Sequence, residues 1–224
     1  MAATPKALLL MLLVMTSSAS PAQAPSDDGP ECSKQGAGKL QLTKEDTTIL
    51  GLTIGTASLK DVEARLGPTN ILPRHGSASA PNTICYVSPA DGTVLTFGAS
   101  GMGGFVDVTE FAIWSREAKF PSVSACSPSK LVSRSLSTPS GIRLGLAVKQ
   151  LSTIVGTHPT TKHAVVHYEL TCRQKMTADE IKGFKTANNW DVSENQYFDV
   201  SSFVDARFSS SGASRIDIAK IESY

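Results

Sequence analysis

The 224-residue chain has almost no net charge, because 21 Lys and Arg stand against 20 Asp and Glu. A protein that neutralises phosphates needs a basic excess, so the composition disfavours a nucleic-acid partner. Hydrophobic residues make up 41% and charged residues 18%, which is typical of a globular chain rather than a disordered one. A bilayer-spanning helix needs about 20 apolar residues, and we expect no integral membrane segment in the mature chain.

Motifs of catalysis are also scarce. Gly98-Ala-Ser100-Gly-Met102 departs at its last position from the Gly-x-Ser-x-Gly elbow of serine hydrolases, and we interpret it as a glycine-rich turn. Asp107 and Asp217 each stand between apolar residues, which predicts that they face solvent on their strands. The sequence therefore predicts no catalytic residue.

The histidines and cysteines do not indicate a metal site. His163 and His167 lie in a β-rich stretch, where a separation of four residues corresponds to about 13 Å. No Cys or His pair has the close spacing of a structural zinc site. We expect neither a metal nor a cofactor.

The N-terminus has the order of a secretory signal peptide. Lys6 precedes the apolar run Ala7–Met15, which is followed by small residues. Cleavage after Ala22 is preferred over cleavage after Ala24, because Pro25 would directly follow the second cut. We expect a signal peptide at 1–22, a flexible mature N-terminus at 23–31, and an exported protein in the periplasm or outside the cell.

The chain has four cysteines, Cys32, Cys85, Cys126 and Cys172, and all of them lie beyond the signal peptide. An even number in an oxidising compartment predicts up to two disulfides. No Cys-x-x-Cys pattern is present, so a thioredoxin-type redox site is disfavoured.

Two segments of the chain contain the same sequence features in the same order. Gly51-Leu-Thr-Ile-Gly55 and Gly141-Ile-Arg-Leu-Gly145 are each followed by an apolar stripe and another glycine. A cysteine precedes each copy, and each copy later has a β-rich stretch that contains a cysteine. The repeated order predicts an internal duplication, with copies at 32–125 and 126–224.

Each copy predicts a short helix followed by three strands. The helical stripes are Leu59, Val62 and Leu66 in the first copy and Val148, Leu151 and Val155 in the second. The expected strands are 83–87, 93–97 and 106–114, then 164–172, 203–208 and 215–222. An insertion at about 173–200 in the second copy opens with a helix capped by Thr177 and Glu180. We expect an α+β fold of two tandem repeats, each a short helix packed on an antiparallel meander of three or more strands.

Equivalent copies would form equivalent disulfides. This symmetry predicts the pairs Cys32–Cys85 and Cys126–Cys172. The alternative crosses the copies, with Cys32–Cys126 and Cys85–Cys172.

The pattern Gly-Ile-x-Leu-Gly-x(5)-Leu-x(3)-Val-Gly-x-x-Pro, followed by a β-meander, is carried here by 51–68 and 141–159. It resembles the helix-plus-sheet unit of small outer-membrane lipoprotein domains of the SmpA type. Tandem copies resemble the β-lactamase-inhibitor-protein fold of secreted bacterial proteins. The resemblance implies a bacterial source and a fold, because the glycines and prolines are structural residues.

Two regions are candidates for partner binding. Trp190, Tyr197 and Phe198 lie in the insertion, and exposed aromatic residues often anchor partners. Alternatively, Trp190 and Phe198 complete the core of the second sheet. Arg74 and His75 begin a polar loop that could form the rim of a binding surface.

The sequence favours a secreted or periplasmic, non-enzymatic binding protein whose partner is another protein, and one version is an inhibitor of a secreted enzyme. One alternative is a structural or assembly factor of the cell envelope. The other is a hydrolase of unrecognised type, which would have a deep pocket with convergent polar groups and a shifted pKa. The identity of the partner, the organism and the oligomeric state stay open.

Overall fold

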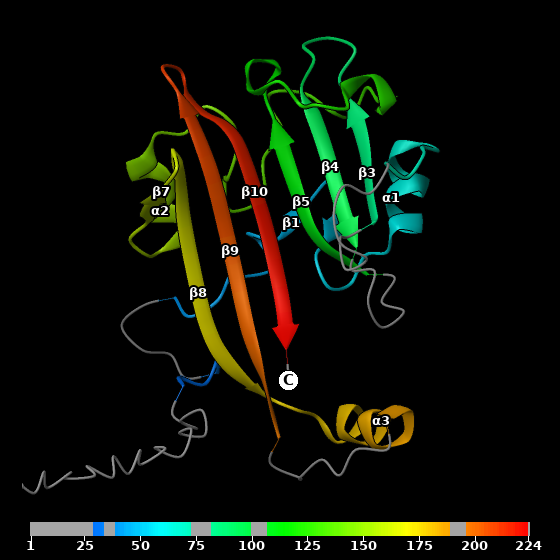
Figure 1. Cartoon of the computed structure of the whole chain (residues 1–224), viewed down its shortest axis with the longest axis vertical. Helices are drawn as coiled ribbons and strands as arrows, with labels where there is room; N and C mark the ends of the chain where they lie inside the picture. Colours follow the sequence, from blue (N-terminus) through cyan, green and yellow to red (C-terminus); the bar gives the residue numbers. More distant parts are fainter. Residues whose placement is uncertain (1–28, 34–38, 73–81, 100–106, 189–195, 224) are drawn as a thin grey trace, which may run out of the picture.

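The computed structural model describes residues 29–33, 39–72, 82–99, 107–188 and 196–223. The fold is α+β, as expected, with few helices and one large, mostly antiparallel sheet of eight strands (Figure 1). In chain order the elements are β1 (Thr48–Ile49), β2 (Leu52–Thr53), α1 (Leu59–Leu66), β3 (Asn82–Val87), β4 (Val94–Ala99), β5 (Val108–Trp114), η1 (Arg116–Ala118), η2 (Val123–Ala125), β6 (Ser127–Pro128), α2 (Val148–Val155), β7 (Thr160–Lys162), β8 (Val165–Lys175), α3 (Ala178–Asn188), β9 (Tyr197–Ser209) and β10 (Gly212–Ser223).

The eight strands follow the order β6-β3-β4-β5-β10-β9-β8-β7. Strands β3, β4 and β5 form one antiparallel meander, and β8, β9 and β10 form a second. The two meanders meet where β5 pairs antiparallel with β10. The sheet is therefore continuous through both segments that the sequence predicts as copies, and these segments are not separate structural units.

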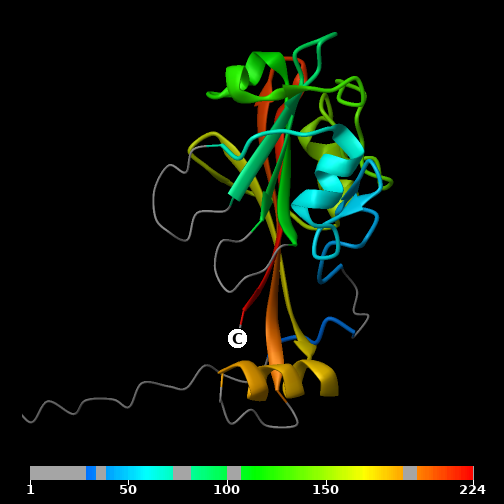
Figure 2. The same cartoon turned by 90° about the vertical axis from the view of Figure 1, so that its right-hand side faces the viewer.

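One face of the sheet is covered and carries the core. Helices α1 and α2 and the segments that precede them lie on this face (Figure 2). The largest fully buried side chains of the sheet point toward them; they include Tyr86, Phe97, Phe111, Tyr168, Ile216 and Ile218. Among the described residues, no helix lies over the middle of the opposite face.

Local sequence explains where the helices begin and end. Ser58 and Asp61 form a capping box at the start of α1, and Thr177 and Glu180 form the expected box before α3. Helix α2 ends at Gly156 in the left-handed conformation, with φ of 82°. Four residues of the expected stripes are buried, while Leu59 is partly buried and Val148 is 38% exposed.

The marker glycines connect the covering segments to the sheet. Gly55 and Gly145 have φ values of 79° and 83°, a region that favours glycine. The Gly55 amide donates to the carbonyl of Val108 on β5, and the Gly145 amide donates to the carbonyl of Ala213 on β10, both at 2.8 Å. These turns fix the covered face against the two strands that join the meanders.

All four cysteines are bonded, in the pairs Cys32–Cys172 and Cys85–Cys126. Both pairings considered from the sequence are therefore wrong. The reason is that the meanders share one sheet, in which β3 and β8 lie far apart on either side of the β5–β10 pair. The cysteine that precedes each predicted copy reaches the first long strand of the other meander.

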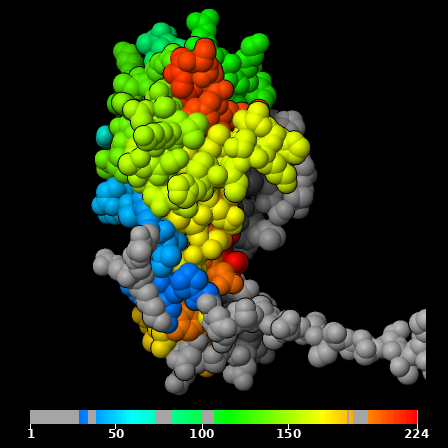
Figure 3. Space-filling view, turned by 90° about the vertical axis from the view of Figure 1, so that its left-hand side faces the viewer, coloured from blue at the N-terminus to red at the C-terminus, as the bar shows by residue number. Residues whose placement is uncertain are grey.

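Each disulfide lies beside a short parallel contact at an outer strand. Ser127 of β6 pairs with Tyr86 of β3, directly next to Cys126 and Cys85. On the other side, Glu31 bridges Arg173 of β8 in parallel, and the Cys32 amide donates to the Arg173 carbonyl at 2.8 Å. Figure 3 shows this N-terminal segment, in blue, against the lower part of the second meander.

We predict that peptide mapping without reduction will recover Cys32 linked to Cys172 and Cys85 linked to Cys126. The folded chain holds the Cα atoms of these pairs 4.9 and 4.8 Å apart, which is within bonding geometry. Mass spectrometry of the digest reads the pairing, and the reduced digest is the control. A linked Cys32–Cys85 peptide would contradict the fold.

Candidate functional site

The uncovered face of the sheet carries the most distinctive group of polar side chains. In the described part of the chain, no helix lies over the middle of this face, while η1 and η2 lie at its upper end (Figure 2). Along β10, Arg215, Asp217 and Ala219 point to the uncovered face, while Ile216 and Ile218 point to the core. Polar residues alternate with apolar ones because only one side of the strand is covered.

A single cross-strand row runs over this face. Its members are opposite one another in register across six strands: Cys85, Thr96, Ala112, Asp217, Asp205 and His167. A neighbouring row brings Gly98, Glu110, Ala219 and Phe203 into line. The β5–β10 pair thus places side chains about a hundred residues apart in sequence next to each other.

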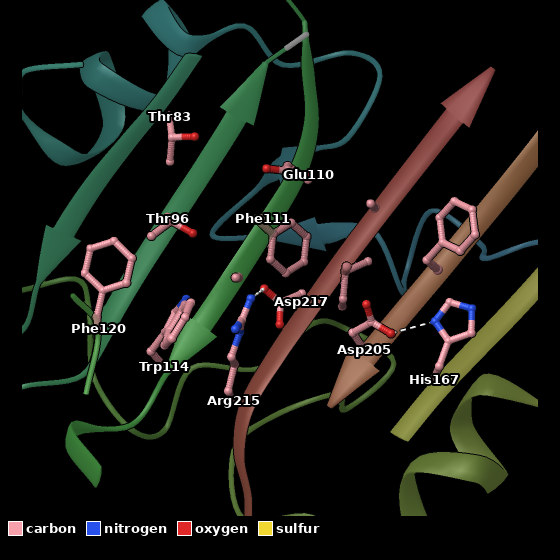
Figure 4. A pocket seen from close by; sticks show the side chains of 14 residues that line it. Thr83, Thr96, Glu110, Phe111, Trp114, Phe120, His167, Asp205, Arg215 and Asp217 are labelled. Atoms are coloured by element: carbon pink, nitrogen blue, oxygen red, sulfur yellow. Dashed lines mark hydrogen bonds and ion pairs between the residues drawn. The ribbon is translucent and has the colours of Figure 1, made fainter. Parts of the chain in front are cut away.

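A hollow of about 440 Å³ lies over these rows (Figure 4). Small residues, Ala112 and Ala219, are among those that line its floor. Larger side chains surround them; these are Glu110, Trp114, Phe120, His167, Phe203, Asp205, Arg215 and Asp217. The hollow therefore exists because the small residues of the central strands are flanked by large ones.

Arg215 and Asp217 form an ion pair at the centre of the hollow. The Arg215 Nη2 atom donates to Asp217 Oδ1 at 2.6 Å, and both side chains are about one quarter exposed, at 26% and 28%. The guanidinium carbon lies 3.8 Å from the centre of the Trp114 ring, and Phe120 meets the same ring edge-on at 5.1 Å. Asp217 is thus partly buried rather than facing solvent as the sequence predicted.

His167 and Asp205 form a second pair at the side of the hollow. The Nδ1 atom of His167 lies 2.6 Å from Asp205 Oδ1, within hydrogen-bond distance. The Nε2 atom of the same ring lies 3.6 Å from Glu169 Oε2, and the ring stacks on Phe203 with centroids 5.8 Å apart. His167 is therefore held between two carboxylates.

The side chain of Glu110, on β5, lies in the hollow and over its partner on β4, Gly98. A Cβ atom at Gly98 would lie only 2.5 Å from Glu110 Oε1, so glycine at 98 leaves the space that the carboxylate occupies. Among the described residues, no hydrogen bond or ion pair joins the Glu110 carboxylate to another side chain.

Strand β5 has a bulge beside Glu110 that the sequence pattern did not indicate. Gly98 pairs with Glu110, but the next residue, Ala99, pairs with Val108, so Thr109 is the extra residue. The bulge turns Val108 into the core, where it is 1% exposed, instead of leaving it on the same face as Glu110.

The two central carboxyls have raised pKa values. Burial raises the pKa of Glu110, the neighbouring Asp217 adds to the effect, and Arg215 partly opposes it. Burial likewise raises the pKa of Asp217, against the favourable hydrogen bond from Arg215. In both cases the hollow withholds water from the carboxylate, which disfavours its charged form.

The residues expected to bind a partner have different fates. Arg74, His75 and Trp190 lie outside the described residues. Phe198 is only 4% exposed and packs with Cys172, Met176 and Val200, so it completes a small core and offers no surface to a partner.

Tyr197 is half-buried and lies under the Arg173 guanidinium, 4.5 Å from its ring centre. Its hydroxyl donates to Glu31 Oε1 at 3.4 Å. Partner binding by Tyr197 stays a prediction.

His163 and His167 do not form a pair. His163 lies in the turn between β7 and β8 with φ of 51°, whereas His167 lies within β8. Among the described residues, no group of three or more His, Cys, Asp or Glu is placed to hold a metal ion. Over the same ranges, no helix is long and apolar enough to cross a membrane.

Comparisons of the chain with family models, curated proteins and solved structures found no significant match.

We predict that Glu110→Gln makes the protein more stable at pH 7, by about 0.5–1 kcal/mol. The folded pKa of Glu110 is raised, so the wild type loses stability as pH rises from the unfolded pKa to the folded one. The gain should therefore vanish below about pH 4, where the carboxyl is protonated in both states. Urea unfolding at pH 3.5 and pH 7 measures the difference.

The matched control for this experiment is Glu63→Gln on α1, for which we expect no gain. A Glu110→Gln protein that is less stable than the wild type at pH 7 would show that the carboxylate has a stabilising partner.

Proposed function

We propose that this chain is an exported, non-enzymatic binding protein that holds a polypeptide partner on the uncovered face of its sheet. The observation that carries the proposal is the hollow on that face, where partly buried charged groups and aromatic rings surround a floor of small residues. Binding sites of this kind combine concave shape with a few placed polar groups. An inhibitor of a secreted enzyme is one version of this function.

The energetics of the site support the proposal. A carboxylate that is partly buried without an ion-pair partner costs free energy of folding. Residues selected only for stability would not keep Glu110 there, whereas binding sites commonly sacrifice stability for function. Glu110 and its companion Gly98 are therefore better explained by binding than by folding.

We further propose that the chain arose by duplication of one helix-plus-meander unit, with copies at 32–125 and 126–224. Three observations support this view. Each of α1 and α2 precedes a three-stranded meander, and the Gly55 and Gly145 turns make matching hydrogen bonds to β5 and β10. The two disulfides are also reciprocal, each joining the first residue of one copy to a strand of the other.

Export is the remaining part of the proposal. Two disulfides are compatible with an oxidising compartment. The predicted signal peptide, 1–22, lies outside the described residues.

We predict that the full chain, produced in an exporting bacterium, will be recovered outside the cytoplasm with Gln23 as its first residue. Mass spectrometry of the intact protein measures the cleavage. Leu10→Asp interrupts the apolar run and should block export, which provides the control. A wild-type protein that stays in the cytoplasm with Met1 retained would contradict export.

We predict that filling the hollow abolishes partner binding. Peptides selected from a displayed random library on the oxidised protein should lose binding to Ala219→Trp, because Ala219 lies on the floor of the hollow. They should keep binding to Ala64→Trp, a matched change on the exposed side of α1. Binding to all three proteins with equal affinity, or failure to select any peptide, would contradict the proposal.

The same experiment addresses the two alternatives. The raised pKa values of Glu110 and Asp217 are the observation that favours a hydrolase. A hydrolase would cleave a captured peptide during incubation, which mass spectrometry detects, whereas a binding protein returns it intact. Replacing the random library with peptides from envelope proteins and from secreted enzymes tests the other alternative, because an envelope assembly factor would bind the first set and not the second.

A further inference from the structure

We infer that the hollow receives a lysine or arginine side chain of an extended polypeptide partner, with the Glu110 carboxylate as its ion-pair acceptor. This inference rests on the proposed binding function and adds the chemistry of the ligand. It follows from the charges in the hollow, the space around Glu110 and the surface that continues below it.

The charged groups of the hollow leave one carboxylate available. Glu110, Asp205, Asp217 and Arg215 line it, a net charge of −2 when His167 is neutral. Asp217 is bonded to Arg215 and Asp205 to His167, both at 2.6 Å. The Glu110 carboxylate has neither a hydrogen bond nor an ion pair within the described ranges, so it can accept a cation from outside.

A cation at Glu110 would offset an existing cost. The carboxylate is desolvated by burial and repelled by Asp217, and both effects disfavour its charged form. A ligand cation reverses the electrostatic part of this penalty and makes a charge-assisted hydrogen bond. An anionic ligand would meet Glu110 and Asp217 together and would be repelled.

The surroundings of Glu110 suit the long side chain of a basic residue. Ala112 and Ala219 provide an apolar floor, and Phe203 provides a ring beside it. The methylene stem of lysine or arginine packs on such surfaces while its charged end reaches a polar partner. The Arg215 guanidinium already stacks on the Trp114 ring. A second cation would therefore bind at Glu110 rather than at this ring.

The surface below the hollow favours a polypeptide over a small amine. Ala219 lies opposite Glu110, and Ile221 lies two residues further along the same face of β10. Ile221 is 52% exposed, so its apolar side chain is open to contact. Two strand residues span about 7 Å, so an extended partner would contact Ile221 with an apolar residue about two positions from its basic residue.

We predict that peptides selected on the wild-type protein will contain a Lys or Arg with an apolar residue two to four positions away. Titration calorimetry should show at least a tenfold weaker affinity for Glu110→Gln, and an equal loss when the basic residue of the peptide is replaced by Met. Glu63→Gln, the matched loss of a carboxylate on α1, should bind as the wild type does. Ile221→Ser should weaken peptide binding without affecting the binding of lysine methyl ester.

The outcomes separate this inference from the proposed function. Peptides that are blocked by Ala219→Trp but bind Glu110→Gln as well as the wild type would overturn the cationic ligand and keep the binding function. Peptides that bind no more tightly than lysine methyl ester would identify a free amine as the ligand and overturn the polypeptide. If Ala219→Trp blocks nothing, the proposed function fails as well.

Discussion

Five residue pairs between β5 and β10 hold the two meanders in one sheet, and the rest of the molecule depends on this contact. On the covered side, the pair Ile113–Ile216 and the pair Phe111–Ile218 place apolar side chains in a common core. On the other side, the same register sets Ala112 opposite Asp217 and brings Trp114 under Arg215. The hollow lies on the junction, so neither meander would form it alone.

The features that the sequence predicted are those set by neighbouring residues. Apolar spacing and a following glycine define α1 and α2. Capping boxes define the start of α1, at Ser58 and Asp61, and the start of α3, at Thr177 and Glu180. The hairpin between β3 and β4 follows from Asp91-Gly92, where the Thr93 amide donates to Asp91 Oδ1 at 2.9 Å. Each signal lies within a few residues, and the α+β class follows from their order.

The disulfide pairing and the candidate site could not be predicted because both depend on contacts between distant segments. The sequence does not contain a local signal for β5 lying beside β10, or for the extra residue at Thr109 that turns Val108 into the core. The alternation of Arg215, Asp217 and Ala219 with isoleucines does mark a strand with one polar face. It indicates the face but not the residues that the neighbouring strands add to it.

The arrangement of the disulfides has a consequence for how the molecules behave toward one another. Each bond anchors a short parallel segment, β6 at β3 and residues 30–32 at β8, over strand edges that would otherwise present free amide and carbonyl groups. Free edges of this kind pair readily with other chains. In a reducing environment these segments would lose their covalent anchors. Oxidation therefore protects the chain against edge-to-edge aggregation, so a reduced sample should self-associate through β3 and β8 before its core unfolds.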